Sequence, residues 1–441
     1  MTRSDKIPSS DYFKRLWSWA LCAYGMLSLS SMAGMGIGSG LFALASLLLF
    51  ARQGKQEGMR GLRQAYANPY AMASLALFLA SFLSLLAAIA FPVEGSQEAV
   101  HLASLKKFHY FLLPPLIAAA LLHSDAKRRL ERHPFWTAWA VMGAFLGVVA
   151  MVQFFGDALF SPEALNNRFF RSVGRTDRYH GQGFMYFHLS FASCMCFVAS
   201  AGWARMIFPL RGDHGKVKLL WGATALLGSA GVYFSYSRIA FAALALLILL
   251  LAFLKKPRWG VIATVIVLAL GAGIWTSSES LRKRFEYGLA GIKERTVMWQ
   301  AARDMYLDHP VTGVGFSRTG ELSPYYKKKN VYDDTTDFTS HAHNNFLDQL
   351  GATGSLGMLA WLAWWGFLFF AAARAFRGSA PEDRWLPAAC IAGFFAFHVN
   401  GLTQVNFWDG KSQHTLMIWA GVALALWIKG RRLEGKGQEQ S

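Results

Sequence analysis

Charged residues are scarce in this chain of 441 residues, at 16%, whereas an ordinary soluble domain carries about 25%. Acidic residues are the scarcer kind, since 26 Asp and Glu stand against 44 Lys and Arg. The shortage of charge excludes an ordinary soluble domain, and Lys- and Arg-rich cytoplasmic loops explain the basic excess without any nucleic-acid partner. Cysteines are also few, and all lie in apolar runs, which argues against a disulfide framework or a cysteine metal site. They are Cys22, Cys194, Cys196 and Cys390.

Apolar residues are abundant, at 54% of the chain, and aromatic residues reach 15%. A membrane helix needs about 20 mostly apolar residues. Runs of that kind predict an all-α polytopic protein with about twelve transmembrane helices, at 16–33, 34–51, 70–91, 108–123, 135–155, 183–204, 219–236, 238–254, 259–276, 346–373, 385–401 and 412–428. No small-residue cleavage site follows the first run, so we expect it to be a retained span. The fourth contains Pro114 and Pro115 and should be kinked.

The distribution of Lys and Arg predicts the orientation. Every loop on the side of the N-terminus is basic, which places that side and both termini in the cytoplasm. We therefore divide the chain into helices 1–9 over 1–276, with an Arg-rich outer loop at 156–182, a large outer loop over 277–345, helices 10–12 over 346–430, and a cytoplasmic tail over 431–441.

The outer loop 156–182 breaks the charge rule, because it carries four arginines in a short translocated segment. Arginine grips phosphate in a bidentate fork, so the loop is a candidate for binding the anionic headgroup of a lipid-linked substrate. Generic pairing with membrane phospholipids is the alternative. The four are Arg168, Arg171, Arg175 and Arg178.

Arg238 stands at a tight outer turn between two spans, directly after Ser237. It could snorkel to the interface, but a rim charge between two membrane helices is also a candidate functional group.

The stretch 277–345 contains a predicted amphipathic helix at 291–307, which ends at His309–Pro310. Its apolar face should carry residues 292, 299, 302 and 306, with Arg295 or Thr296 on or beside that face. The following segment, 317–340, is polar and is expected to form a loop. It holds Asp333, Asp334 and Asp337, which offer hard oxygen ligands but lack the spacing of a known metal cage.

The most informative segment is Ser-His-Ala-His-Asn-Asn at 340–345, which runs directly into an apolar helix. At that position His343 could accept a proton near neutral pH, with Asn344 or Asp348 orienting its ring. The pair of His341 and His343 could also be part of a zinc site, although no third ligand stands at a supporting spacing. Glycines at 351, 354 and 357 would let another helix or a lipid approach closely.

These residues resemble the bacterial O-antigen ligase family, which is related to the O-antigen polymerases and to the O-linked oligosaccharyltransferases. The family signature is His, then Asn, Ser or Gln, nine residues, Gly, two residues, and then Gly, Thr or Tyr. It is complete here as His343, Asn344, Gly354 and Gly357. The pattern Arg295, Trp299, His309, Pro310, Gly313 and Gly315, and the turn Ser237–Arg238, are also similar to the family.

The resemblance implies a membrane glycosyltransferase of lipopolysaccharide assembly in a Gram-negative inner membrane, with its active site facing the periplasm. Its donor would be O-antigen on undecaprenyl diphosphate and its acceptor a sugar hydroxyl of lipid A–core, joined by an inverting transfer without metal or other cofactor. His343 would be the general base, with Arg238 and Arg295 as the required arginines.

Three alternatives remain open at this stage. A sister enzyme, either an O-antigen polymerase or a protein O-oligosaccharyltransferase, shares the donor and the arginines. A transporter of lipid-linked glycan suits twelve spans, although no internal repeat is visible. A metal-dependent glycosyltransferase would use the aspartates at 333–337.

Overall fold

The computed structural model describes residues 10–52, 66–93, 99–123, 130–170, 179–277, 279–330 and 340–438. Within these ranges the regular structure is helical and contains no strand longer than an isolated bridge residue, Tyr179. The predicted all-α class is therefore confirmed.

The first half of the chain forms α1 (Ser10–Leu27), α2 (Met32–Arg52), α4 (Pro69–Ala90), the 3-10 helix η1 (Leu102–Leu112), α5 (Leu113–His123), the short η2 (Leu130–Arg132), α6 (Pro134–Phe154), α7 (Gly156–Leu159) and α8 (Pro162–Leu165). The second half forms α9 (His188–Ile207), α10 (Gly215–Phe234), α11 (Arg238–Lys255), α12 (Pro257–Ser277), α13 (Glu279–Asp308), α14 (Thr319–Lys329), α15 (Asn345–Gly378), the short η3 (Pro381–Asp383), α16 (Trp385–Asn400) and α17 (Gly410–Gln438).

In the described ranges, nine helices are long and apolar enough to cross a membrane: α2, α4, η1 with α5, α6, α9, α10, α11, α12 and α15. The other three predicted spans coincide with α1, α16 and α17, of which α16 has only 16 residues. The predicted kink of the fourth span takes the form of a change from 3-10 to α geometry at Leu113, directly before Pro114 and Pro115. The structure is thus that of a multi-pass membrane protein.

Burial distinguishes central helices from peripheral ones. Helix α9 packs against α10, α11, α16 and α17, and most of its residues are buried. Helix α12 instead exposes Val261, Ile262, Val265 and Leu268, and in water that apolar surface would cost roughly 25 cal/mol per Å². Such a helix is stable only where lipid surrounds it, so α12 marks the outer wall of the bundle.

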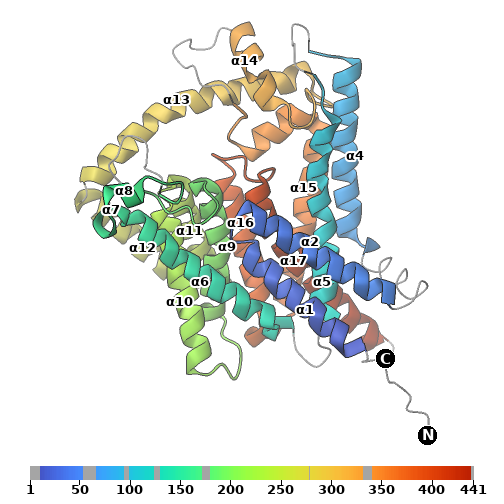
Figure 1. Cartoon of the computed structure of the whole chain (residues 1–441), viewed down its shortest axis with the longest axis vertical. Coiled ribbons are helices and arrows are strands. Elements are labelled where there is room, and N and C mark those ends of the chain that lie inside the picture. The colour runs from blue at the N-terminus through green and yellow to red at the C-terminus, as the bar shows by residue number, and fades with distance from the viewer. Residues whose placement is uncertain are drawn as a thin grey trace.

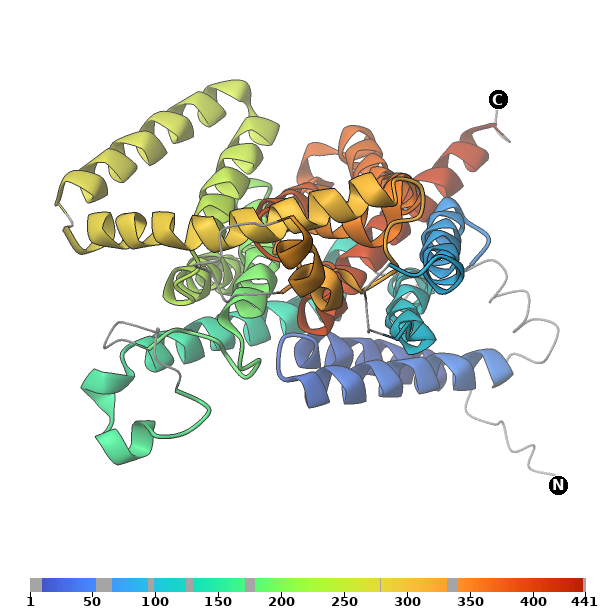
Figure 2. The same cartoon turned by 90° about the horizontal axis from the view of Figure 1, so that it is seen from above.

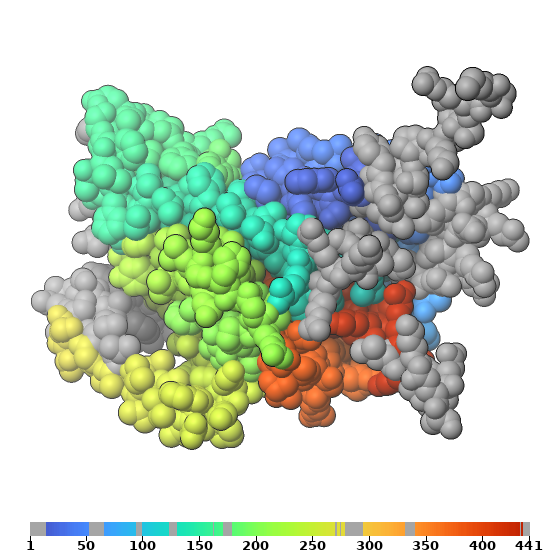
Figure 3. Space-filling view, turned by 90° about the horizontal axis from the view of Figure 1, so that it is seen from below, coloured from blue at the N-terminus to red at the C-terminus, as the bar shows by residue number. Residues whose placement is uncertain are grey.

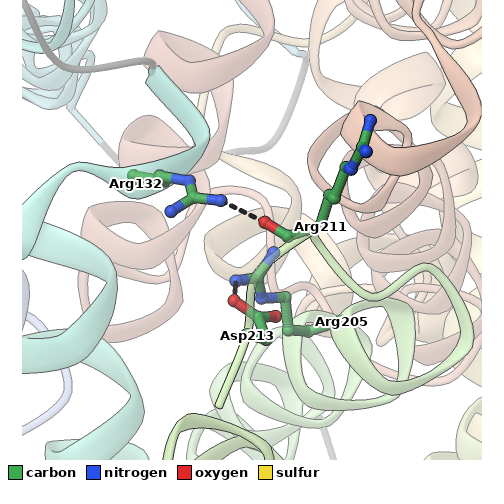
Figure 4. Close-up of polar contacts among 4 residues, drawn as sticks. All are labelled: Arg132, Arg205, Arg211 and Asp213. Carbon is green, nitrogen blue, oxygen red and sulfur yellow. Dashed lines mark hydrogen bonds and ion pairs between the residues drawn. The ribbon is translucent and has the colours of Figure 1, made fainter.

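Some charged side chains at the end of the bundle where both termini lie (Figure 1) are paired within the chain. Arg205 is only 6% exposed, but its guanidinium lies 2.8 Å from Asp213 (Figure 4). The same guanidinium lies 5.1 Å from the ring centre of Trp385. Arg132 donates to the backbone carbonyl of Arg211. These contacts tie the segments around 130, 205–220 and 385 together, and their surfaces meet in the space-filling view of this end (Figure 3).

Helix α13 crosses the opposite end of the bundle, from α12 toward α15 (Figures 1 and 2). It is longer than the predicted segment 291–307. Its buried side chains in the described part are Val297, Met298, Ala301, Ala302 and Met305, so the predicted face was partly wrong. The reason is that α13 packs against both α15 and α14, which buries a wider stripe than one partner would.

The prediction of a loop over 317–340 was wrong for 319–329, where α14 forms. Gly320 and Pro324 weaken the local helical signal there. Leu322 and Tyr326, one turn apart, are buried with Ala301 and Met305 of α13. Tertiary packing therefore stabilises a helix that local propensity does not favour.

Candidate active site

Helix α15 is bent at Gly354, whose φ of 61° and ψ of −164° are not helical. At the bend the helix exchanges its own hydrogen bonds for bonds to the turn that follows α13. Four backbone hydrogen bonds join the two segments: Val314 N–H to Gly351 O (3.0 Å), Gly315 N–H to Ala352 O (3.0 Å), Ser355 N–H to Pro310 O (2.8 Å) and Leu356 N–H to Val311 O (3.1 Å). Because these bonds satisfy the groups that the bend releases, the break is stable at membrane depth.

The close approach predicted from the glycine spacing is therefore present, but the partners differ along the segment. Gly351 lies against the backbone of Ala302 in α13, and Gly354 lies against Val311 and Thr312. Gly357 faces the Thr353 side chain of its own helix. Two of the three glycines thus hold α13 and its following turn against α15.

Arg295 comes from α13 and is partly buried. Burial lowers the pKa of its guanidinium, and the neighbouring positive charge of Arg238 lowers it further. Arg238 is the first residue of α11, placed there because Tyr236 adopts a positive φ of 62° that reverses the chain after α10. Two arginines from distant segments thus lie within electrostatic range of each other, which favours a bound anion.

His343 precedes α15 and adopts a positive φ of 46°. Its backbone N–H donates to Nδ1 of His341 at 3.3 Å, and the two rings lie 4.3 Å apart. Burial, followed by the charges of His341 and Arg295, lowers the pKa of His343 to about 4, while a side-chain hydrogen bond with Gln404 opposes the shift. The imidazole is therefore neutral at pH 7 and has a lone pair to accept a proton.

The structure thus joins the three residues singled out as catalytic: Arg295 interacts electrostatically with both Arg238 and His343. The three residues belong to α11, to α13 and to the segment directly before α15, which lie far apart in the sequence. Convergence of two cations and a neutral imidazole suits a reaction in which an anion leaves while a proton is removed.

Asn344 and Asp348 make hydrogen bonds that hold the start of α15 in place. The Asn344 side-chain oxygen accepts from the N–H groups of Phe346 and Leu347, which makes it the N-cap of α15, and its amide donates to Leu402 O at 3.1 Å. Asp348 accepts from Thr319 Oγ1 of α14. The hydrogen bonds of these two residues thus go to the start of α15, to Leu402 and to Thr319, and the expected contact with the His343 ring is not among them.

The Arg-rich loop is described only in part. Arg168 is exposed, and none of the contacts described above links it to Arg238, Arg295 or His343. Its segment is anchored on the buried Gln153, whose amide donates to Phe169 O and to Gly183 O, both at 2.9 Å. Arg171, Arg175 and Arg178 lie outside the described residues, so their expected role stays a prediction.

Sequence reasoning missed two polar residues. Gln404 lies between α16 and α17, in a segment where neither spacing nor periodicity singles it out. Lys107 directly precedes the predicted span 108–123, and no role was predicted for it. It donates to Ser317 Oγ at 2.9 Å and lies within electrostatic range of Asp348 and Asp409. A lysine at the edge of a predicted span was the signal available for Lys107.

In the described parts of the chain, no group of three or more His, Cys, Asp or Glu side chains could hold a metal ion. Asp333, Asp334 and Asp337 lie outside those parts. The four cysteines are buried and free, as expected for small apolar residues.

Fold and site together define an all-α, multi-pass membrane protein with a cluster of two arginines and a histidine at one end of its bundle. Residues 223–362 match the family model described as O-antigen ligase, so the predicted resemblance is confirmed for this part of the chain. The match runs from α10 into α15 and includes Arg238, Arg295 and His343. No curated protein matches the chain. The family match supports a membrane enzyme of the O-antigen ligase and polymerase type.

Proposed function

We propose that this protein is an O-antigen ligase: it moves O-antigen polysaccharide from undecaprenyl diphosphate to a sugar hydroxyl of lipid A–core, with inversion at the donor anomeric carbon. The observation that carries the proposal is the position of Arg295, which lies within electrostatic range of both Arg238 and His343. The family match supports the class of enzyme and its lipid-linked substrates.

The arginines act on the leaving group. Negative charge grows on the diphosphate oxygens as the bond from the anomeric carbon to phosphate oxygen breaks. Two guanidinium groups that repel each other in the free enzyme lose that repulsion when the diphosphate binds, and they stabilise its charge further in the transition state. Arg238 is exposed and Arg295 partly buried, so the pair can hold a phosphate at the edge of the site.

His343 acts on the acceptor. The imidazole takes the proton of the acceptor hydroxyl while the oxygen forms its bond to the anomeric carbon, and undecaprenyl diphosphate leaves with the electron pair of the broken bond. The low pKa of His343 keeps the ring neutral before reaction. Neutralisation of Arg295 by the diphosphate removes one cause of that low pKa, so donor binding strengthens the base.

We further propose that the protein lies in the inner membrane with both termini in the cytoplasm. Basic loops lie at the end of the bundle that holds the termini, which the positive-inside rule assigns to the cytoplasm. Helices α13 and α14 then face the periplasm with the candidate site, and no metal or other cofactor takes part.

The test is transfer by purified protein in detergent, with lipid-linked O-antigen as donor and lipid A–core as acceptor. His343→Ala should lower the rate about 100-fold or more, the lower range for loss of a general base. The matched control is His214→Ala, because His214 is exposed in the loop before α10 at the opposite end of the bundle. Full activity of His343→Ala would overturn the proposed mechanism.

The acceptor distinguishes the related enzymes. A second arm replaces lipid A–core with a pilin peptide, and a third supplies only lipid-linked O-antigen. Transfer to lipid A–core alone supports the ligase, whereas modification of the peptide or elongation of the donor would show a protein O-oligosaccharyltransferase or a polymerase.

A further inference from the structure

An apolar groove lies between α4 and the 3-10 helix η1. Its volume is about 420 Å³, which is within the range of about 300–1,000 Å³ for ligand pockets in proteins. Tyr70, Leu75 and Phe78 line it from α4, and Leu105 and Phe108 line it from η1. The side chain of Leu75 is 56% exposed, so the groove opens toward the surface of the bundle, where the bilayer lies.

The far end of the groove depends on the two prolines of this span. Pro115 has no N–H, so it cannot donate a helical hydrogen bond to the carbonyl of Phe111 four residues earlier. The hydroxyl of Tyr70 donates to that carbonyl instead at 3.3 Å, and Tyr66 donates to Leu112 O at 2.7 Å. Both hydroxyls are thereby bonded to backbone, so the two tyrosines line the groove with apolar ring surface.

The near end of the groove lies beside the turn that fastens α13 to α15. The ring of Phe108 lies 5.5 Å from that of Phe316, which directly follows the turn 310–315. Lys107 donates to Ser317 Oγ at 2.9 Å. The groove therefore begins at the elements that position the candidate site and extends along α4 away from them.

The rim of the groove is basic. Lys106 and His109 both line it, and both side chains are exposed. In the proposed orientation, η1 follows the outer end of α4, on the side where the positive-inside rule disfavours lysine. A basic rim above an apolar groove is complementary to a lipid that has an anionic headgroup and acyl chains.

The groove and the arginine pair lie on opposite sides of α15. Helix α4 packs against α15 at one edge of the bundle, whereas α11, which begins with Arg238, packs against α12 and α16 toward the other edge (Figures 1 and 2). A donor whose diphosphate is held by Arg238 and Arg295 therefore leaves the groove open to a second lipid. The proposed reaction needs one, because its acceptor is also anchored in the membrane.

We propose that this groove binds an acyl chain of the lipid A–core acceptor, with Lys106 at a phosphate of its headgroup. The acceptor then reaches the candidate site from the side of α4, while the donor enters from the side of α11 and α12. The inference rests on the proposed function, since it assigns a binding site to the acceptor of that reaction.

A photoreactive phenylalanine analogue at position 75 tests what occupies the groove. The purified protein is illuminated in vesicles of phosphatidylethanolamine and phosphatidylglycerol that also contain lipid A–core and lipid-linked O-antigen. We expect the analogue at Leu75 to capture lipid A–core several-fold above its share of the vesicle lipid. The matched control is the analogue at Val265 of α12, which is 61% exposed and should show no such enrichment.

Ala71→Trp tests the groove by filling it, since Ala71 is part of the lining. The KM for lipid A–core should rise about tenfold, a modest change because the surrounding lipid is as apolar as the groove and only packing contacts are lost. The KM for the donor and kcat should keep their wild-type values. Ala76→Trp is the control: Ala76 is exposed on the same helix outside the lining, and neither KM should change.

Lys106→Gln tests the charge at the rim. The KM for lipid A–core should rise several-fold in this variant, and the difference from wild type should shrink as salt screens the charge. With an acceptor from which the lipid A phosphates have been removed, wild type and Lys106→Gln should have the same KM. An equal loss with the dephosphorylated acceptor would overturn the role of Lys106.

The outcomes separate this site from the proposed function. Capture by the analogue at Leu75 should persist in a His343→Ala background, where the acceptor binds without being consumed. If the analogue captures only phospholipid in proportion to the vesicle composition, the groove holds ordinary membrane lipid and the inference fails while the function stands. Capture of the donor, or a raised donor KM in Ala71→Trp, would assign the groove to the polyprenyl chain and also overturn the inference. A fully active His343→Ala would instead overturn the proposed mechanism and leave the groove assignment intact.

Discussion

Gly313 and Gly354 each lie against the backbone of the other's segment. A Cβ at Gly313 would be 2.4 Å from the carbonyl carbon of Ala352, and a Cβ at Gly354 would be 2.4 Å from that of Val311. Both residues have positive φ, at 65° and 61°. The pair fastens the helix that carries Arg295 to the helix that follows His343, so the geometry of the candidate site depends on two residues that have no side chain.

Gly354→Ala should therefore destabilise the protein. The ψ of −164° at this φ is essentially accessible to glycine alone, and forcing another residue into it costs on the order of 1–3 kcal/mol before the clash with Val311 is counted. Thermal unfolding in detergent should show a clearly lower Tm.

Gly366→Ala is the control, since Gly366 lies in the same helix with open space around it. Alanine there should keep or raise the Tm, because alanine exceeds glycine in helix propensity by about 1 kcal/mol. Equal Tm values for the two variants would contradict the interlocking of Gly313 and Gly354.

Features set by local sequence were predictable. Hydropathy located the spans because lipid imposes length and apolarity on each helix separately. The boundary between His343 and α15 was also readable, since Asn344 is a strong capping residue directly before an apolar run. The tight turn at Ser237–Arg238 followed from two apolar runs with almost no residues between them.

Features set by tertiary packing were not predictable. The bend at Gly354 exists because the turn 310–315 replaces its hydrogen bonds, and nothing near Gly354 in the sequence reports that turn. Helix α14 depends on burial of Leu322 and Tyr326 against α13. The segment between α16 and α17 lies beside the start of α15 because Asn345 and Asn406 join two segments about sixty positions apart.

The two arginines provide a prediction about rate. Arg238→Ala and Arg295→Ala should each lower kcat/KM about 100-fold or more, as for loss of one charged donor to a developing anion. Because both act on the same diphosphate, the double variant should lose less than the product of the single losses. Steady-state kinetics over a range of donor concentrations measure all three.

Arg258→Ala is the matched control for the arginines. Arg258 is exposed at the start of α12, among the basic residues at the far end of the bundle, and its loss should leave kcat/KM unchanged. Strictly multiplicative losses for Arg238 and Arg295 would show that they act on separate groups, against the proposed shared diphosphate.

The ion pair of Arg205 and Asp213 provides a prediction about stability alone. Asp213→Ala leaves a guanidinium that is 6% exposed without its carboxylate, and breaking a buried pair in this way costs about 3–5 kcal/mol. The Tm should fall, whereas transfer activity per folded molecule should not change, because the pair lies at the opposite end from His343. The double variant Arg205→Met with Asp213→Ala should recover most of the Tm, and a failure to recover would mean that Asp213 stabilises the loop by other contacts.

The pH dependence of transfer should distinguish the pKa of His343 in the free enzyme from its pKa in the complex with the donor. As pH falls through the pKa of His343, the ring takes up a proton and can no longer act as a base, so activity is lost on the acid side. The profile of kcat/KM for the donor reports the free enzyme, and its acid limb should lie near pH 4. The profile of kcat reports the bound state, in which the diphosphate offsets the charge of Arg295, so its acid limb should lie at higher pH.

Arg295→Ala removes one of the charges that lower the pKa of His343. The residual activity of this variant should therefore show the acid limb of kcat/KM displaced to higher pH as well. A limb near 6.5, the ordinary pKa of histidine, in both wild-type profiles and unmoved by Arg295→Ala would mean that Arg295 does not act on the base at all.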